Sequence, residues 1–158
     1  MIDIPMISEE NVSELRLTYI NDIDEQVSAI HNAFAFMEFD PSGYILEAND
    51  SYLGLIGYEL DDLRGKHHSI FLDHLYSSSK EHKDFWKSLA NGEPHSGRFF
   101  RYRKDGSKVW LQASYTPSTN EDGIVDKIIK LAIEIKKPVA DIENQKLNFS
   151  NGVHATVF

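Results

Sequence analysis

The segment IVDKIIKLAIEI, residues 124–135, constrains the fold more than any other part of the sequence. In an extended strand, successive side chains point to opposite faces. Apolar residues then occupy both faces, with Ile128 and Ala132 on one and Ile129, Leu131, Ile133 and Ile135 on the other. Such a strand is usually central in a sheet that is covered on both sides. The sequence therefore predicts a central strand here, with a layer of structure over each face.

Two further strands precede this segment and are joined by tight turns. GRFFRYR and KVWLQASYT flank the turn KDGS, in which Asp-Gly is a strong hairpin signal, and the turn NEDG leads into the last strand. Alternation predicts Leu111 and Ala113 on the inner face and Trp110 on the outer face, available to a helix or a partner. The basic residues of this region are interleaved with aromatics and indicate a solvated strand face: Arg98, Arg101, Arg103 and Lys104.

The first part of the chain has the periodicity of a long helix, over residues 8–32. Ser8 is a suitable N-cap, and two glutamates follow it in the first turn, where the helix dipole favours acids. Apolar residues recur at intervals of three and four along one stripe: Val12, Leu15, Tyr19, Ile23, Val27, Ile30 and Phe34. We expect this stripe to be buried against the sheet of its own domain, against a second copy of the chain, or against both.

A hairpin around the turn DPSG follows, and shorter helical segments come after it. Asn49 and Asp50 are both suited to cap the first of these helices. Ser77 or Ser78 is expected to cap a firmer helix over residues 80–90. This order of elements predicts an α+β fold, with a five-stranded antiparallel sheet, short helices on one face and the N-terminal amphipathic helix on the other.

Composition and charge argue against several classes of protein. The 158 residues carry a formal net charge of −9, with 25 acidic against 16 basic residues, which disfavours nucleic acid and anionic membranes as partners. The absence of cysteine excludes a disulfide, a thiolate nucleophile and a cysteine-ligated zinc ion. No apolar run approaches the ~20 residues that cross a bilayer. We therefore expect a cytoplasmic protein without direct membrane insertion.

The sequence contains no constellation of residues typical of an enzyme. It has no G-x-S-x-G nucleophile elbow, no P-loop and no dinucleotide fingerprint. The carboxylates Glu38, Asp40, Glu47 and Asp50 fall near a predicted turn, where acids are usually solvated. We expect a binding or signalling domain, with no catalytic residues and no enzymatic activity.

Four segments, in this order and at these spacings, resemble a PAS domain: GYILEAND at 43–50, GYELDDLRG at 57–65, GEPHSGRF at 92–99 and DGSKVWL at 105–111. The resemblance covers residues 34–136. It leaves residues 1–33 as a helix for capping or dimerisation and residues 137–158 as a polar tail or linker. GKHHSIF, DFWKSLANGE and VWLQASYTP are most similar to PAS domains of bacterial methyl-accepting chemotaxis receptors of the energy-taxis and biofilm-dispersal type.

This resemblance implies a sensory role in chemotaxis signalling. The domain would detect a small ligand, redox state or oxygen, and would relay the signal to an output domain or a partner protein through rearrangement of a homodimer. The residues expected to pack in the dimer or against the helix are apolar: Leu15, Tyr19, Ile23, Val27, Trp110, Ile129, Leu131 and Ile133.

The resemblance also frames the question of a cofactor. Flavin photosensors of the superfamily carry a reactive cysteine where this sequence has His68, and amide side chains near the positions of Leu111 and Ala132, so covalent photochemistry is excluded. Non-covalent FAD stays open. Haem sensors place the proximal histidine on the helix before the third strand, where His82 lies, with Trp86 on the same helix face. Haem iron held by His82 is the sharper alternative, and it is the only metal expected.

The remaining pocket residues are predicted to be structural. Adjacent side chains diverge by about 100° on a helix and 180° on a strand, so His67 and His68 are not expected to chelate one metal ion. We expect His68 to point inward, where it would line the pocket or bond a backbone carbonyl. Asn49 is expected to cap a helix, and the alternative is that it bonds a ligand or fastens the helices beside the pocket.

A module without any ligand is the last alternative, in which the domain serves only interaction and dimerisation. Its pocket would be filled by large apolar side chains: Phe36, Leu53, Ile56, Phe71 and Trp86.

Overall fold

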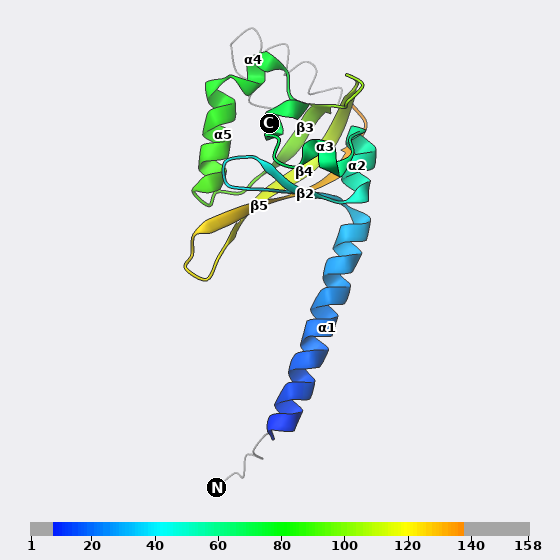
Figure 1. Cartoon of the computed structure of the whole chain (residues 1–158), viewed down its shortest axis with the longest axis vertical. Helices are drawn as coiled ribbons and strands as arrows, with labels where there is room; N and C mark the ends of the chain where they lie inside the picture. Colours follow the sequence, from blue (N-terminus) through cyan, green and yellow to red (C-terminus); the bar gives the residue numbers. More distant parts are fainter. Residues whose placement is uncertain (1–7, 138–158) are drawn as a thin grey trace. The chain divides into compact units, whose positions relative to one another are not determined.

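The computed structural model describes residues 8–137 and divides the chain into two units after Ala33. The first unit contains α1 (Glu9–Ala33), one uninterrupted helix (Figure 1). Ser8 caps α1 as predicted, because its hydroxyl accepts a hydrogen bond from the amide of Asn11 at 3.2 Å. No residue of α1 is buried, and the predicted apolar stripe is exposed along the helix. None of the helices within the described residues has the length and apolarity that a membrane span requires.

The second unit contains a five-stranded antiparallel sheet, as predicted. Its strands are β1 (Ala35–Phe39), β2 (Ile45–Ala48), β3 (His95–Tyr102), β4 (Lys108–Thr119) and β5 (Val125–Ile135). They lie in the order β2-β1-β5-β4-β3. The strand with two apolar faces, β5, is therefore central, between β1 and β4. The predicted α+β class is confirmed.

Short helices connect β2 to β3. They are α2 (Asp50–Ile56), α3 (Leu60–Leu63), the 3₁₀-helix η1 (His68–Phe71), α4 (His74–Ser77) and α5 (Lys80–Ala90). In Figure 1, α5 lies on one side of the sheet unit, and α2 and α3 lie on the other. Between them, side chains from the helices and from one face of the sheet form a single core. We call this face the inner face of the sheet.

One predicted helix cap is confirmed by the structure, and another is wrong. Asn49 caps α2, since its side chain accepts a hydrogen bond from the amide of Tyr52 at 3.0 Å. The prediction that Ser77 or Ser78 caps α5 is wrong, because the cap is Ser79. The reason is an extra helical turn, α4, which begins after Asp73 and ends at Ser77. The carboxylate of Asp73 caps that turn and moves the next helix start along the chain.

Strand register assigns the side chains to the two faces of the sheet. Leu111 and Ala113 lie on the inner face and belong to the core, as predicted. Phe36 pairs with Leu131 and faces outward, so the prediction that it fills the inner pocket is wrong. Trp110 faces outward as predicted, but it is 6% exposed and packs on Phe100, with ring centroids 5.4 Å apart. It is therefore not an open contact surface.

Candidate functional site

The two adjacent histidines have different roles, which follow from the position of η1. His67 caps η1, because its Nδ1 accepts a hydrogen bond from the amide of Ser69 at 3.1 Å. Its Nε2 must then carry the proton, and it donates to the carbonyl of Ser42 at 2.9 Å. His67 thus ties η1 to the turn between β1 and β2. His68 is fully buried and points inward as predicted, but its Nε2 lies 3.1 Å from the Tyr115 hydroxyl and not beside a carbonyl.

Gly43 allows the turn between β1 and β2 to approach these rings. Its φ of +93° lies in the left-handed region that favours glycine. A Cβ at this position would lie 2.7 Å from His67 Nε2 and 2.9 Å from the ring of Trp86. The glycine therefore serves both the backbone conformation and the close packing of the turn against α5.

Helix α5 directs His82, Phe85 and Trp86 into the core. His82 Nδ1 lies 3.1 Å from the carbonyl of Ser77, so this nitrogen carries the proton and donates it. Its Nε2 is then an acceptor, and Trp86 Nε1 donates to it at 3.2 Å. Both ring nitrogens of His82 are engaged within the protein.

A chain of polar groups continues from His82 across the inner face. His68 Nδ1 lies 3.5 Å from His82 Nε2, at the limit of a hydrogen bond. On its other side, His68 faces the hydroxyl of Tyr115, which accepts a hydrogen bond from Arg101 Nη2 at 3.0 Å. This arrangement directs the hydroxyl proton of Tyr115 to His68 Nε2, and the proton of His68 to His82. The four side chains form one connected network.

A second buried basic side chain lies beside this network. Lys130, on β5, is fully buried and donates a hydrogen bond to the Tyr52 hydroxyl at 2.8 Å. Its Nζ lies over the rings of Tyr52 and Tyr115, 5.0 and 4.9 Å from their centroids. We call the six residues of the network and of this contact the inner site: Arg101, Tyr115, His68, His82, Lys130 and Tyr52.

The inner site has no internal counter-charge. The buried side chains with a titratable or charged group other than tyrosine are all basic in the described part of the chain: His68, His82, Arg101 and Lys130. Among residues 8–137, no carboxylate lies within the 4.0 Å ion-pair distance of Arg101 or Lys130. Buried charges are normally paired, because leaving water costs an isolated ion several kcal/mol.

The pKa values of these groups follow from burial and from mutual repulsion. Burial lowers the pKa of Lys130 well below its ordinary value, and the charge of Arg101 lowers it further. The pKa of His68 is lowered by burial, by Arg101 and by Lys130. Burial also lowers the pKa of His82 to about 4, although the bond to the Ser77 carbonyl opposes this. Both histidines are therefore neutral at pH 7, whereas an arginine stays charged.

The floor of the inner site is a row of small residues across four strands. Gly97 pairs with Ala113, Ala113 with Ala132, and Ala132 with Ala35. Arg101 lies further along β3, opposite Val109, whereas Tyr115 lies opposite His95. The bond between Arg101 and Tyr115 thus crosses the positions of Phe99 and Gly97, and the guanidinium lies 5.0 Å from the centroid of the Phe99 ring. The long Arg101 side chain occupies space that small side chains leave.

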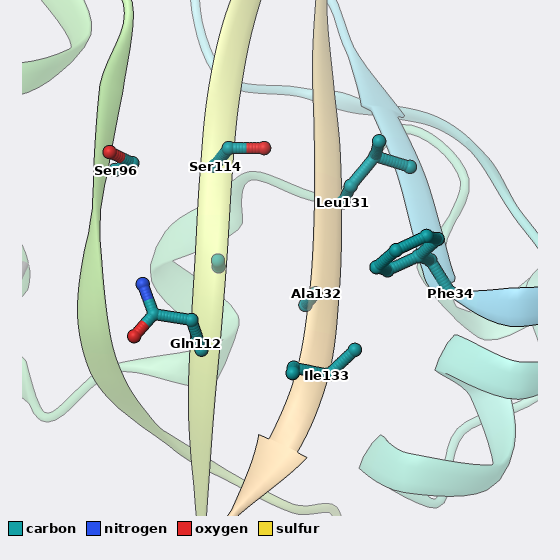
Figure 2. Close-up of a pocket in the computed structure, with 8 residues that line it drawn as sticks. Phe34, Ser96, Gln112, Ser114, Leu131, Ala132 and Ile133 are labelled. Carbon is teal, nitrogen blue, oxygen red and sulfur yellow. The ribbon is translucent and has the colours of Figure 1, made fainter. Parts of the chain in front are cut away.

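The outer face of the sheet carries an open groove of about 320 Å³ (Figure 2). Phe34, Leu131 and Ile133 supply its apolar surface, and polar side chains of β3 and β4 lie along it. Ile133 is 43% exposed and Phe34 is 37% exposed. Ile129 lies on the same face and is half-buried. The strand residues among those predicted to pack against a helix or partner, Trp110, Ile129, Leu131 and Ile133, thus lie on this face.

A second cleft, of about 450 Å³, lies between α5 and the turn from β1 to β2. Its lining includes His67, His82 and Trp86, with Lys83 and Lys87 of α5. This cleft connects the edge of the inner site to the surface of the molecule.

The arrangement does not fit haem. An axial ligand needs a free ring nitrogen, and both nitrogens of His82 are bonded to protein groups. The ring of His68 also stacks beside His82, with centroids 5.7 Å apart and planes at 20°. Elsewhere within the described residues, no three His, Cys, Asp or Glu side chains are placed to hold a metal ion.

The fit to a flavin is partial. Arg101 and Lys130 are buried donors that suit the oxygen atoms of a flavin or its phosphates. The inner face, however, is filled by the side chains of the inner site and of Phe71. A flavin ring would fit only if Arg101 withdrew from the small-residue floor. No cysteine is present, so the residues allow at most a non-covalent flavin.

Sequence reasoning found part of this site. His68, His82, Trp86, Leu111 and Ala132 are all buried on or against the inner face. The fastening role expected for Asn49 is present, because its side-chain oxygen accepts from the amide of Phe36 at 3.0 Å and its nitrogen donates to the Phe34 carbonyl at 2.9 Å. Asn49 thereby joins α2 to β1.

Arg101 and Lys130 were missed. The prediction that Arg101 belongs to a solvated strand face is wrong, because it is 1% exposed. The alternation of side chains along each strand was the signal that could have predicted their burial. Lys130 lies between Ile128 and Ala132 on the inner face of β5, and Arg101 has the same phase as Phe99 on β3.

Comparisons with known proteins agree with this architecture. A sequence profile of the PAS fold matches residues 45–132. Biofilm dispersion protein BdlA of Pseudomonas aeruginosa is 38% identical over 109 residues, which cover 69% of this chain and 26% of that protein. The aerotaxis receptor of Escherichia coli is 34% identical over 85 residues, covering 54% of this chain and 17% of the receptor. The chain thus spans about a quarter or less of the length of these relatives.

Solved structures show the same fold at lower sequence identity. A light-oxygen-voltage domain from a study of a flavin analogue has a TM-score of 0.61 and 22% identity, over 81% of this chain and 95% of that one. The light-state structure of the Aureochrome1 light-oxygen-voltage domain has a TM-score of 0.59 and 20% identity, over 79% of this chain and 98% of that one. The profile covers more than half of the chain, and the sheet order and helical layer accord with it, so the chain belongs to the PAS family.

Proposed function

We propose that this chain is the sensory module of a chemotaxis-type signalling protein, with no enzymatic activity of its own. It acts in the cytoplasm as a homodimer, detects a small ligand or a redox change at the inner site, and relays it to an output domain or a partner protein. The kinship to an aerotaxis receptor and to a biofilm dispersion protein supports this role.

One observation carries the proposal: the same strands hold the inner site and the exposed apolar groove. On β5, Lys130 points into the inner site, and its neighbours Ile129 and Leu131 point outward. On β4, Tyr115 alternates in the same way with Ser114, which lines the groove. A change that moves the inner side chains therefore shifts the surface on the other face of the sheet.

Two exposed apolar surfaces support the homodimer. One is the stripe along α1, where Leu15, Tyr19 and Val27 are 64%, 67% and 50% exposed. The other is the outer groove, with Phe34 and Ile133. Contiguous apolar surface on a protein usually marks an interaction site. We propose that a second copy of the chain covers both surfaces.

Sedimentation velocity tests the homodimer. Wild type is expected to sediment as a dimer at micromolar concentration. Ile133→Glu places a charge in the groove and is expected to raise the dimer dissociation constant at least about tenfold, a cost of about 1.4 kcal/mol. Ile124→Glu is the matched control, because Ile124 is 62% exposed in the turn before β5 and does not line the groove. A wild-type monomer would overturn the dimeric mechanism.

A non-covalent flavin is the second candidate, favoured by the structural neighbours from work on light-oxygen-voltage domains. The absorption spectrum of freshly purified protein separates the candidates. A flavin gives bands in the visible region, and a haem gives a Soret band that His82→Ala would remove. We expect a featureless spectrum above 300 nm, about where aromatic side-chain absorption ends. A module that binds no ligand, with a core filled by Ile56, Phe71 and Trp86, would give the same spectrum and is distinguished by ligand titration.

A further inference from the structure

We infer that the inner site binds a small organic monocarboxylate, and that Arg101 is the residue that pairs with its carboxylate group. The inference rests on the proposed sensory function and adds the chemical class of the ligand. It depends on four features of the inner site: its charge, a free donor, the floor, and the neighbouring hydroxyls.

The unpaired positive charge of Arg101 favours the binding of an anion. Arg101 is 1% exposed, and an arginine cannot lose its proton under ordinary conditions. The groups that accept its hydrogen bonds are neutral: the Tyr115 hydroxyl accepts from Nη2, and the backbone carbonyl of Phe100 accepts from Nη1 at 2.7 Å. No Asp or Glu within the described residues pairs with it. A bound anion would supply the missing counter-charge and remove much of the cost of burial.

One hydrogen-bond donor of Arg101 is free. Its Nε is the one buried side-chain nitrogen or oxygen in the described residues that lacks a hydrogen-bond partner. Nε–H and one Nη2–H lie along the same edge of a guanidinium group, and a carboxylate bridges that edge with two parallel bonds. Tyr115 uses only one of the two hydrogens of Nη2. The guanidinium edge that a carboxylate needs is therefore present, and one of its two donors, Nε–H, has no partner.

The floor limits the size of the ligand. The row from Gly97 through Ala113 and Ala132 to Ala35 presents only short side chains to the inner face, and the Arg101 side chain crosses beside it to reach Tyr115. A short acid fits if the Arg101 side chain withdraws by a change of rotamer. A short acid is favoured over long chains and rings, because Phe99 and Leu111 pair beside Gly97 and Ala113 and are almost fully buried.

The charge of Arg101 favours a single negative charge on the ligand, and Lys130 favours a polar substituent. The Arg101 guanidinium stays protonated under ordinary conditions, whereas burial lowers the pKa of Lys130 well below its usual range. A monoanion matches that charge, and a dianion exceeds it. Lys130 donates to the Tyr52 hydroxyl and lies 4.9 Å from the centroid of the Tyr115 ring, so Lys130 and Tyr52 are the groups that would bond a hydroxyl or keto oxygen next to the carboxylate. Short hydroxy and keto acids are thus the expected ligands.

Thermal unfolding of the full chain, with calorimetric titration, tests the inference. The probes are sodium lactate, sodium pyruvate and sodium acetate, and the controls are sodium chloride and sodium phosphate at equal ionic strength. We expect lactate or pyruvate to raise Tm by about 5–10 °C at a hundredfold excess over Kd. Acetate, which lacks the hydroxyl or keto oxygen next to the carboxylate, is expected to bind at least about tenfold more weakly.

Substitutions at Arg101 identify the residue responsible. Arg101→Met is expected to abolish the shift with every acid. Arg101→Lys, which keeps the charge but loses the two-pronged edge, is expected to bind at least about tenfold more weakly and serves if the methionine variant does not fold. Arg98→Met is the matched control, since Arg98 is exposed on the same strand, and it is expected to keep the wild-type shift.

The outcomes separate this inference from the proposed function. The inference is overturned if no acid raises Tm beyond chloride at about 10 mM, if phosphate acts as strongly as lactate, or if Arg101→Lys responds as wild type does. None of these results would change the dimer that is expected in sedimentation velocity. Conversely, a monomeric protein that binds lactate through Arg101 would retain the ligand and remove the proposed relay.

Discussion

The two faces of the sheet have opposite chemistry, although the same strands form both. The inner face carries the apolar core with basic and hydroxyl groups buried in it, and the outer face carries exposed apolar groups. Lys130 is fully buried, whereas Ile133, three residues later on the same strand, is 43% exposed. This reverses the usual distribution, in which lysine is almost never fully buried and large aliphatic residues are mostly inside.

This difference between the two faces separates the groups that stabilise the fold from those that do not. The apolar core around the inner site, with Phe39, Phe71, Trp86 and Leu89, supplies hydrophobic stabilisation. The two buried basic side chains, Arg101 and Lys130, reduce that stabilisation, because the described residues provide no carboxylate for them. Exposed apolar residues on the outer face contribute little to folding until something covers them. Both departures from the usual pattern are therefore best explained by binding.

The largest expected effect comes from a core residue at the edge of the inner site. Trp86→Ala removes a large buried side chain that contacts Phe39 and His68, with ring centroids 5.2 Å apart in each pair. We expect a loss of about 3–5 kcal/mol in the free energy of unfolding, measured by urea denaturation. Leu75→Ala on α4 is the control, because Leu75 is 82% exposed, and a change within about ±0.5 kcal/mol is expected. Equal losses in both variants would contradict the division between core and surface.

The next effect is a fall in stability with acidification. The pKa of His82 is about 4 in the folded protein against an ordinary 6.5, so the unfolded chain binds the proton first as pH decreases. Stability is then lost progressively from about pH 6.5 towards pH 4, and the buried His68 adds to the loss. After allowance for screening at the cleft, we expect His82 to contribute about 1–2 kcal/mol.

Denaturation at several pH values measures this effect. His82→Gln is expected to flatten the dependence between pH 6.5 and pH 4, and His74→Gln, an exposed histidine on α4, is the matched control. If wild type became more stable on acidification over this range, the assignment of neutral buried histidines would be wrong.

Removing the buried amine of Lys130 is expected to stabilise the protein. Lys130→Met keeps the length of the side chain and removes the buried amino group, and we expect the free energy of unfolding to rise by about 1–3 kcal/mol. Lys127→Met is the control, because Lys127 is partly exposed and makes a surface ion pair with Glu38 at 3.3 Å, so a change below about 1 kcal/mol is expected. A clear loss of stability in Lys130→Met would show that Lys130 holds the fold together and is not a ligand group.

The smallest effect on folding is expected on the outer face. Leu131→Ala removes a half-buried side chain from the groove, and we expect it to cost less than about 1 kcal/mol in the unfolding of the monomer. The same substitution is expected to raise the dimer dissociation constant about tenfold, because the side chain lies in the surface that the second copy covers. Sedimentation velocity measures this change. A large folding defect without any change in dimerisation would place Leu131 in the core instead.

Local patterns in the sequence determined most of the architecture. Alternation of side chains predicted that β5 is central and that Leu111 and Ala113 face inward, because a strand repeats every two residues. Spacings of three and four predicted α1, and Asp-Gly predicted the hairpin between β3 and β4. These features depend on neighbours in the chain, so the sequence alone contains them.

Only the tertiary structure decided the chemistry of the inner site. Lys130 comes from β5, Arg101 from β3, Tyr52 from α2 and His68 from η1, and no local spacing brings them together. The sequence also does not show whether a long polar side chain reaches water or, as Arg101 does, crosses a floor of small residues. Their burial depends on packing between distant segments, and that packing is what turns scattered basic residues into one site.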